Sequence, residues 1–293
     1  MSNELCSQVR KDLCIEDIVK MILKSLKAAA LTAALLFSAN AFVGTATAAE
    51  VIGEYANGCI KGAVPLNNGN NYQVQIWGRG RNYGHPELID YIQKLVLKAK
   101  HYNLPDLLIG DLSKRQGGSF GGGSSHGSHQ SGLDVDISFD FATPKKSFFE
   151  LSHPQDVYLV DTHNRVTKNF DKRRVALIYL AASDSRVERI FVAPGIKKAL
   201  CQVYEGHDKS WLQKLRPWFG HRGHMHVRLA CPLDSPLCVN QAKAPQGDGC
   251  GQELDSWLYP QKYAQKPAKK GKPQVKKKRV MPPECRALFA SHY

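Results

Sequence analysis

The chain has 293 residues, of which 43% are hydrophobic and 23% charged, which excludes a disordered chain and indicates one or two globular domains with a real core. The formal net charge is +14, but residues 261–281 carry nine Lys or Arg and no acid, which leaves +5 for the rest. The basic charge is therefore largely a property of one segment, and it affects solubility and attraction to polyanions rather than the fold.

The N-terminus has the composition of an export signal. Two lysines precede an apolar run over residues 28–37, and small residues up to Ala48 form a plausible cleavage site. The run is too short to span a bilayer. We therefore predict that residues 1–48 are a signal peptide. Met21 is interpreted as the true start of translation. The alternative is a signal peptide with an unusually long N-terminal region before the apolar run.

The body of the chain mixes strands and helices. Residues 50–66 are expected to be an irregular segment anchored at Cys59, and residues 211–219 an amphipathic one. Without a regular βαβ rhythm, the pattern predicts an α+β fold with an antiparallel central sheet and flanking helices. Periodicity gives, in chain order, a strand at Tyr72–Trp77, a helix at Pro86–Lys100, strands at Leu107–Ile109 and Leu133–Phe139, a helix at Arg173–Ala182, a strand at Val187–Val192, a helix at Pro194–Cys201 and a strand at His224–Leu229.

Two segments have low-complexity composition. Residues 117–123 include five glycines, which suit a loop that approaches an extended ligand or moves as a lid, with a surface linker as the alternative. Residues 260–283 are rich in Lys, Pro and Gln, and are predicted to be an extended linker. A single folded domain is expected to span 49–259, with 284–293 tied back by Cys285.

The strand at Leu133–Phe139 lies next to a histidine pair. Its period of two places Asp134 and Asp136 on one face. His129 precedes Asp136 by seven residues across a glycine turn, so both side chains can reach one metal ion. His126 is either a fourth ligand or lies just outside the site. Asp134 is expected to fix the tautomer of a ligand histidine.

A second histidine cluster lies far downstream. His224 and His226 point to the same side of their strand, and His226 completes a His-Asp-His ligand set that suits zinc. Water bound to such an ion could attack a carbonyl carbon. His224 would then donate to the oxyanion, and His221 would orient the water or move protons. The two clusters hold five of the eleven histidines.

Six cysteines remain after export. An even number in an exported chain predicts disulfides. Spacing alone supports only Cys231–Cys238, and the other four cysteines allow three pairings.

The two histidine motifs resemble those of the penicillin-insensitive murein endopeptidases, a family of the LAS superfamily that includes the D-Ala-D-Ala metallopeptidases. The similarity covers residue 58 to the C-terminus, and is carried by Ser128-His-Gln-Ser-Gly-Leu-Asp-Val-Asp136 and by His221-Arg-Gly-His-Met-His226. Shorter pieces such as Tyr83-Gly-His-Pro86 and Ile109-Gly-Asp111 agree with it.

The resemblance implies a LAS-like fold and a periplasmic enzyme that cleaves the D-alanyl–meso-diaminopimelyl cross-link of peptidoglycan and is insensitive to β-lactams. It implies zinc held by His129, Asp136 and His226 with His126 near the metal, and His221 and His224 as catalytic residues. It also implies a homodimer. The disulfides that it implies are Cys59–Cys285, Cys201–Cys250 and Cys231–Cys238.

Three functions remain open. The first is the zinc endopeptidase. The second is a zinc D,D-carboxypeptidase that trims a terminal D-alanine, and the third is a zinc-stabilised wall-binding protein without turnover. Arg222 and Arg228 are candidates to meet a substrate carboxylate. A nucleic-acid partner is not expected, because the chain is exported and its basic run from Lys266 to Arg279 contains no aromatic residue.

Overall fold

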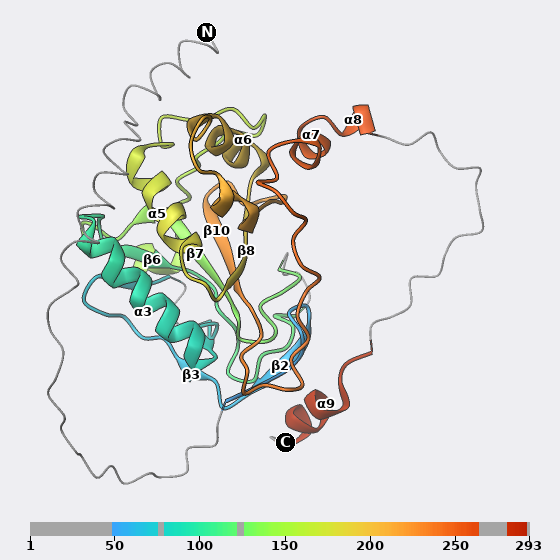
Figure 1. Cartoon of the computed structure of the whole chain (residues 1–293). Helices are drawn as coiled ribbons and strands as arrows, with labels where there is room; N and C mark the ends of the chain where they lie inside the picture. The colour runs from blue at the N-terminus through green and yellow to red at the C-terminus, as the bar shows by residue number, and fades with distance from the viewer. Residues whose placement is uncertain (1–48, 76–78, 122–125, 264–279, 292–293) are drawn as a thin grey trace, which may run out of the picture. The chain divides into compact units, whose positions relative to one another are not determined.

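The computed structural model describes residues 49–75, 79–121, 126–263 and 280–291 (Figure 1). The predicted signal peptide and most of the predicted linker lie outside these ranges. Within them, no helix is both long and apolar enough to cross a membrane.

A six-stranded sheet forms the centre of the fold. The four central strands pair antiparallel with one another, whereas the outer pairs β4–β6 and β8–β9 are parallel. The prediction of an antiparallel sheet was therefore wrong at both edges, and the sheet is mixed. Its order is β4 (Tyr72–Val74), β6 (Leu107–Ile109), β7 (Asp134–Phe141), β10 (His224–Leu229), β8 (Val187–Val192) and β9 (Leu215–Pro217).

Helical crossovers explain the parallel edges. The chain passes from β4 to β6 through α3 (Pro86–His101), and from β8 to β9 through α6 (Pro194–Val203) and the short 3-10 helix η1 (Ser210–Lys214). A parallel pair needs such a crossover. The expected amphipathic segment at residues 211–219 is instead η1 followed by β9. Pro217 explains the change, because the residue before a proline is biased to an extended backbone.

The predicted helices are confirmed to within two residues at each end. Pro86 occupies the first turn of α3, where its missing N–H costs no hydrogen bond, and Nδ1 of His85 accepts from the backbone N–H of Glu87 at 3.2 Å. Helix α5 (Lys172–Ala182) packs against α3 and β8, and Figure 1 shows α3 and α5 on one side of the central strands. The core-facing residues of β7 and β10, Val135, Ile137, Met225 and Val227, are fully buried.

The first described segment corrects another prediction. Residues 50–66, expected to be irregular, contain an antiparallel hairpin of β1 (Glu50–Glu54) and β2 (Asn57–Lys61). The turn residues Tyr55 and Ala56 carry no turn signal, and glycines inside both strands weaken the pattern. A second short sheet pairs β3 (Val64–Pro65) with β5 (Tyr83–Gly84). The remaining helices are α4 (Phe148–Ser152), α7 (Gln252–Leu258), α8 (Pro260–Tyr263) and α9 (Pro283–Ala290).

Three disulfides cross-link the chain, in the pairings that the family resemblance implies. Cys59–Cys285 ties α9 to β2, Cys201–Cys250 ties the segment before α7 to α6, and Cys231–Cys238 closes a short loop after β10.

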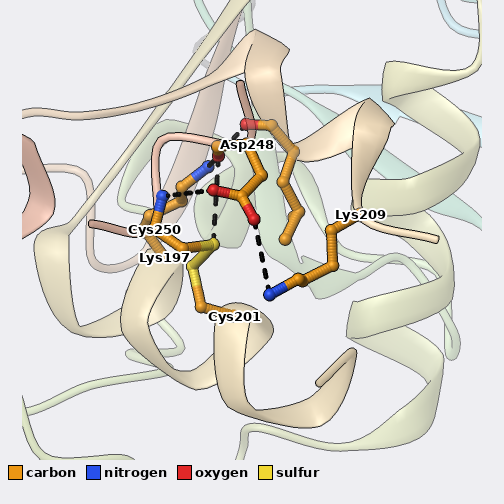
Figure 2. Close-up of a disulfide and its surroundings, with 6 residues drawn as sticks. Lys197, Cys201, Lys209, Asp248 and Cys250 are labelled. Carbon is orange, nitrogen blue, oxygen red and sulfur yellow. Dashed lines mark hydrogen bonds and ion pairs between the residues drawn. A yellow bond between two sulfur atoms is a disulfide. The ribbon is translucent and has the colours of Figure 1, made fainter. Parts of the chain in front are cut away.

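A buried lysine reinforces the second disulfide. Lys197 on α6 is fully buried, and its Nζ donates to the backbone carbonyls of Leu212, at 2.5 Å, and of Asp248. Figure 2 shows Asp248 between Lys197, Lys209 and the disulfide. The ammonium and the disulfide together fix the segment that leads into α7.

Candidate metal centre

Strand register brings the two predicted motifs together. In the antiparallel β7–β10 pair, Asp136 lies opposite His226, and Asp134 lies opposite Arg228. Residues two apart on a strand share a face, so His224 lies on this face as well. The alternate residues of both strands belong to the core, which leaves the polar face for chemistry.

A left-handed turn delivers His129 to the same face. His129 has φ of 65° and Gly132 has φ of 74°, a backbone region that non-glycine residues rarely adopt. The N–H of His129 donates to Oδ2 of Asp134 at 3.0 Å, which holds this turn against β7. As a result Nε2 of the fully buried His129 lies 3.3 Å from Oδ1 of Asp136.

Four of the predicted site residues surround the carboxylate of Asp136. Nδ1 of His126 lies 3.8 Å from Oδ2, and Nδ1 of His226 lies 3.2 Å from Oδ1. His126, His129 and Asp136 each offer one ligand atom, and these atoms all lie within 4.8 Å of one another. His226 adjoins the group, with its ring centroid 4.5 Å from that of His129.

The hydrogen bonding of these buried atoms favours a cation. Both ring nitrogens of His129 and Oδ1 of Asp136 are buried without a correctly aligned hydrogen-bond partner in the described part of the chain. Buried polar atoms are seldom left unpaired, because an unpaired one costs about 1–3 kcal/mol. Imidazole nitrogen and carboxylate oxygen facing one point suit a divalent transition metal. The residues present therefore fit a bound metal ion.

Asp134 lies behind this group rather than in it. It is fully buried and accepts from Arg228 Nε at 2.7 Å and Arg228 Nη2 at 3.1 Å. Its Oδ1 also lies 3.2 Å from Nε2 of His226. Burial alone would raise the pKa of Asp134, but Arg228 and His226 together hold that pKa well below its usual range. Asp134 is therefore an anion beside His226, consistent with a role in orienting its ring.

This arrangement removes Arg228 from the candidates for substrate recognition. Its side chain is buried, its Nη1 donates to Gln241 Oε1 at 2.6 Å, and its guanidinium lies 4.2 Å from the centre of the Tyr55 ring. Arg228 lies opposite Asp134 in the β7–β10 pair, and its guanidinium is directed to that carboxylate. Arg222 instead lies over the Tyr158 ring, at 4.3 Å.

His221 and His224 lie at the more accessible side of the group. Both are half-buried, and their ring centroids are 5.1 Å apart. Nε2 of His224 lies 3.9 Å from Oδ1 of Asp136. Nδ1 of His221 lies 2.6 Å from the carbonyl oxygen of Phe219, and a carbonyl can only accept, so this nitrogen carries the hydrogen. Burial, with His224 and His226 nearby, lowers the pKa of His221 to about 3, which keeps the ring neutral.

Two residues beside the candidate metal centre were not among the predicted site residues. Asp111, at the end of β6, is buried, and its Oδ2 lies 3.7 Å from Nε2 of His126. Phe120, within the glycine segment, stacks on His129 with ring centroids 5.7 Å apart. An acid directly after a buried strand, and a single aromatic among glycines, were signals that could have identified both.

Comparison with known proteins identifies a family. A family model described as penicillin-insensitive murein endopeptidase matches residues 51–290. The protein named penicillin-insensitive murein endopeptidase from Yersinia enterocolitica serotype O:8 is 45% identical over 247 residues, covering 83% of this chain and 86% of the relative. The proteins of the same name from Salmonella paratyphi B and Salmonella typhimurium are each 46% identical over 250 residues, covering 84% of this chain and 88% of each relative.

Proposed function

This chain belongs to the penicillin-insensitive murein endopeptidase family, as its histidine motifs predicted, and we propose that it is a zinc endopeptidase that hydrolyses peptide cross-links of peptidoglycan. The bond proposed is the D-alanyl–meso-diaminopimelyl amide. The observation that carries the proposal is the group of buried imidazoles around the Asp136 carboxylate, whose unpaired atoms fit a metal ion.

His129, Asp136 and His226 would hold the zinc, with His126 beside it. When bound, zinc supplies a Lewis acid and a water acidified toward neutral pH. Such chemistry does not depend on an acylated serine, so a β-lactam has no nucleophile to trap. Asp134 would orient the ring of His226, because its Oδ1 lies 3.2 Å from Nε2 of that ring.

Two histidines would handle protons and developing charge. His221 carries its hydrogen on Nδ1, at the Phe219 carbonyl, which leaves the lone pair of Nε2 to face the substrate, where it would orient the attacking water or relay a proton to the leaving amine. His224 would donate to the oxyanion of the tetrahedral intermediate. Both side chains are partly exposed, as groups that meet a substrate must be.

The proposal includes the cell location and the organisation of the chain. Residues 1–48 would direct export to the periplasm, 49–259 would form the peptidase domain, and 260–283 would be the linker before the segment held by Cys285. The antiparallel pair β7–β10, which carries the proposed ligands Asp136 and His226, supports the LAS-like fold. Dimerisation, implied by the family, would be tested by sedimentation of the mature protein.

The test is mass spectrometry of muropeptides after incubation with the mature protein, with penicillin present throughout. We expect cross-linked dimers to become monomers with metal-loaded protein, and no change after chelation. Conversion of pentapeptides to tetrapeptides, with dimers intact, would show a carboxypeptidase instead. No product from either substrate would show a wall-binding protein without turnover.

A further inference from the structure

An aromatic cluster lies on the surface next to the candidate metal centre. Trp218 and Phe219 follow β9 and are 49% and 75% exposed. The half-buried Trp257 of α7 contacts both, with ring centroids 5.4 Å from Trp218 and 4.8 Å from Phe219. We call these three rings the aromatic platform. Clustered exposed rings are unfavourable in water and commonly mark a binding site.

The aromatic platform is continuous with the catalytic groups. Phe191 of β8 connects the two, since its ring lies 5.7 Å from that of Trp218 and 5.4 Å from that of His226. The carbonyl of Phe219 also accepts the hydrogen bond of His221. A substrate whose reacting bond lies at His221 would therefore extend onto these rings.

The aromatic platform is held on a rigid support. The N–H of Trp218 donates to the Val192 carbonyl at 2.9 Å, which fixes the segment after β9 to the end of β8. Trp257 is fixed through α7, where Glu253 forms an ion pair with Arg216 of β9. The Cys201–Cys250 disulfide and Lys197 secure the segment just before α7 (Figure 2). Rings held in this way lose little entropy when a ligand stacks on them.

We propose that the aromatic platform binds the sugar rings of the glycan strand from which the cleaved stem peptide extends. This proposal rests on the endopeptidase function above. A pyranose ring presents apolar C–H groups on its faces, which pack against aromatic faces, and its polar groups point outward at the edges. The stem peptide is a poorer partner, because its carboxylates and short side chains find no cation among the three rings.

The distances allow a glycan to reach the aromatic platform while its cross-link lies at the metal centre. Ring contacts of 5.4, 5.7 and 5.4 Å lead from His226 through Phe191 and Trp218 to Trp257. An extended peptide spans about 3.3–3.6 Å per residue, so a stem of about four residues covers a comparable length. A cross-link at the metal centre therefore allows the sugar at the far end of its stem to reach the aromatic platform.

The test compares two substrates that differ only in their sugars: cross-linked dimers that carry disaccharides, and the same peptides after an amidase has removed them. We expect the wild-type protein to have a higher kcat/KM on the sugar-bearing dimer, through a lower KM. Trp257→Ala should reduce the ratio of the two kcat/KM values about fivefold or more, as expected for loss of a stacked aromatic contact. Trp257→Phe, which keeps a ring face, should restore most of the ratio.

A matched control separates the aromatic platform from exposed rings in general. Phe148 of α4 is 68% exposed, outside the platform, and Phe148→Ala should keep the wild-type ratio. Thermal unfolding of each variant verifies that it is folded. An equal ratio in wild type and Trp257→Ala would overturn the proposal while leaving the endopeptidase function intact, whereas failure of the wild-type protein to cleave either dimer would refute that function. A change of sedimenting mass in Trp257→Ala, with both dimers cleaved equally, would identify the surface as a subunit interface instead.

Discussion

At the residue scale, Asp134 illustrates how a group outside the proposed ligand set can orient a proposed ligand. Its carboxylate accepts from the backbone of His129, lies against His226 and pairs with Arg228. Asp134→Asn keeps the shape but removes the charge that orients His226. We expect metal affinity to fall about 10–100-fold. The measurement is competitive titration with a chromophoric chelator, and Asp140→Asn, on the same strand beside Lys146, is the control. Unchanged affinity would show that Asp134 only fills space.

The division between ligands and catalysts gives a second prediction. His224→Ala and His221→Ala should each reduce turnover on muropeptide dimers about 100-fold or more, as for loss of a general acid–base or oxyanion group, yet retain about one metal per chain. His129→Ala should lose the metal, because His129 contributes a ligand atom to the group around Asp136. Metal analysis after gel filtration is the measurement. Stoichiometric metal loss in either of the first two variants would place that histidine among the ligands.

Lys197 gives a prediction about pH. Burial, with Arg216 nearby, lowers the pKa of its ammonium to about 7, whereas an unfolded lysine titrates near about 10.4. Between these values the unfolded chain holds a proton that the folded chain has lost, so this residue makes stability rise with pH. The free energy of unfolding of the wild type, relative to Lys197→Met, should therefore increase from pH 7 to pH 10. Urea denaturation across this range measures it, with Lys198→Met as the background. A difference that falls with pH would show that the carbonyls of Leu212 and Asp248 keep the ammonium charged.

The two site motifs differ from Lys197 in how far sequence could predict them. The chemistry of His129, Asp136 and His226 was visible because histidines and acids at these spacings are uncommon together. Their meeting depends on β7 pairing with β10 in register, which no local pattern specifies. Lys197 offered no signal at all, since a lysine in a helix is usually solvated, and only tertiary packing buries this one.

At the element scale, strands with a strong local pattern were predicted well. β10 and β8 have the predicted bounds, and in β10 the histidines of the candidate site alternate with core residues. The β1–β2 hairpin and β9 were missed, because glycines inside the hairpin strands and a proline at the end of β9 hide the period. The parallel β8–β9 edge follows from the same omission, since without β9 the crossover through α6 had no strand to reach.

Two of the disulfides close loops of very different length, which predicts how much each stabilises the fold. Cys201–Cys250 closes 49 residues, whereas Cys231–Cys238 closes 7. In the chain-entropy model, losing the first costs about 4 kcal/mol of unfolding free energy and losing the second about 2 kcal/mol. Replacing each pair by serine and measuring denaturant unfolding tests the order. If loss of either disulfide lowers the free energy of unfolding by the same amount, native contacts rather than loop length determine how much each disulfide stabilises the fold. Loss of Cys201–Cys250 should also expose the segment before α7 to proteolysis, because this disulfide fixes the segment to α6 (Figure 2).

At the scale of the whole molecule, positive charge is concentrated in one segment of the sequence, which contains none of the proposed site residues. Residues 261–281 carry nine basic side chains and no acid, while the proposed ligands Asp136 and His226 lie on strands of the central sheet. A polybasic segment attracts a polyanion over a distance that salt shortens, with a Debye length of about 10 Å at 0.1 M. Wall association and peptide hydrolysis should therefore respond to different substitutions.

Replacing the nine basic residues of 261–281 by glutamine tests that separation and keeps the length of the segment before α9. We expect weaker binding to isolated sacculi at low ionic strength and a flatter dependence on salt, because fewer counterions are released. Turnover on soluble muropeptide dimers should stay within about twofold of wild type, since no residue of the site changes and surface charges act over little more than a Debye length. Cosedimentation over a salt series measures binding to sacculi, and cleavage of soluble dimers measures turnover. An unchanged binding curve at low salt would mean that the segment acts only as a solvated spacer, and that attachment to the wall comes from the substrate-binding surface itself.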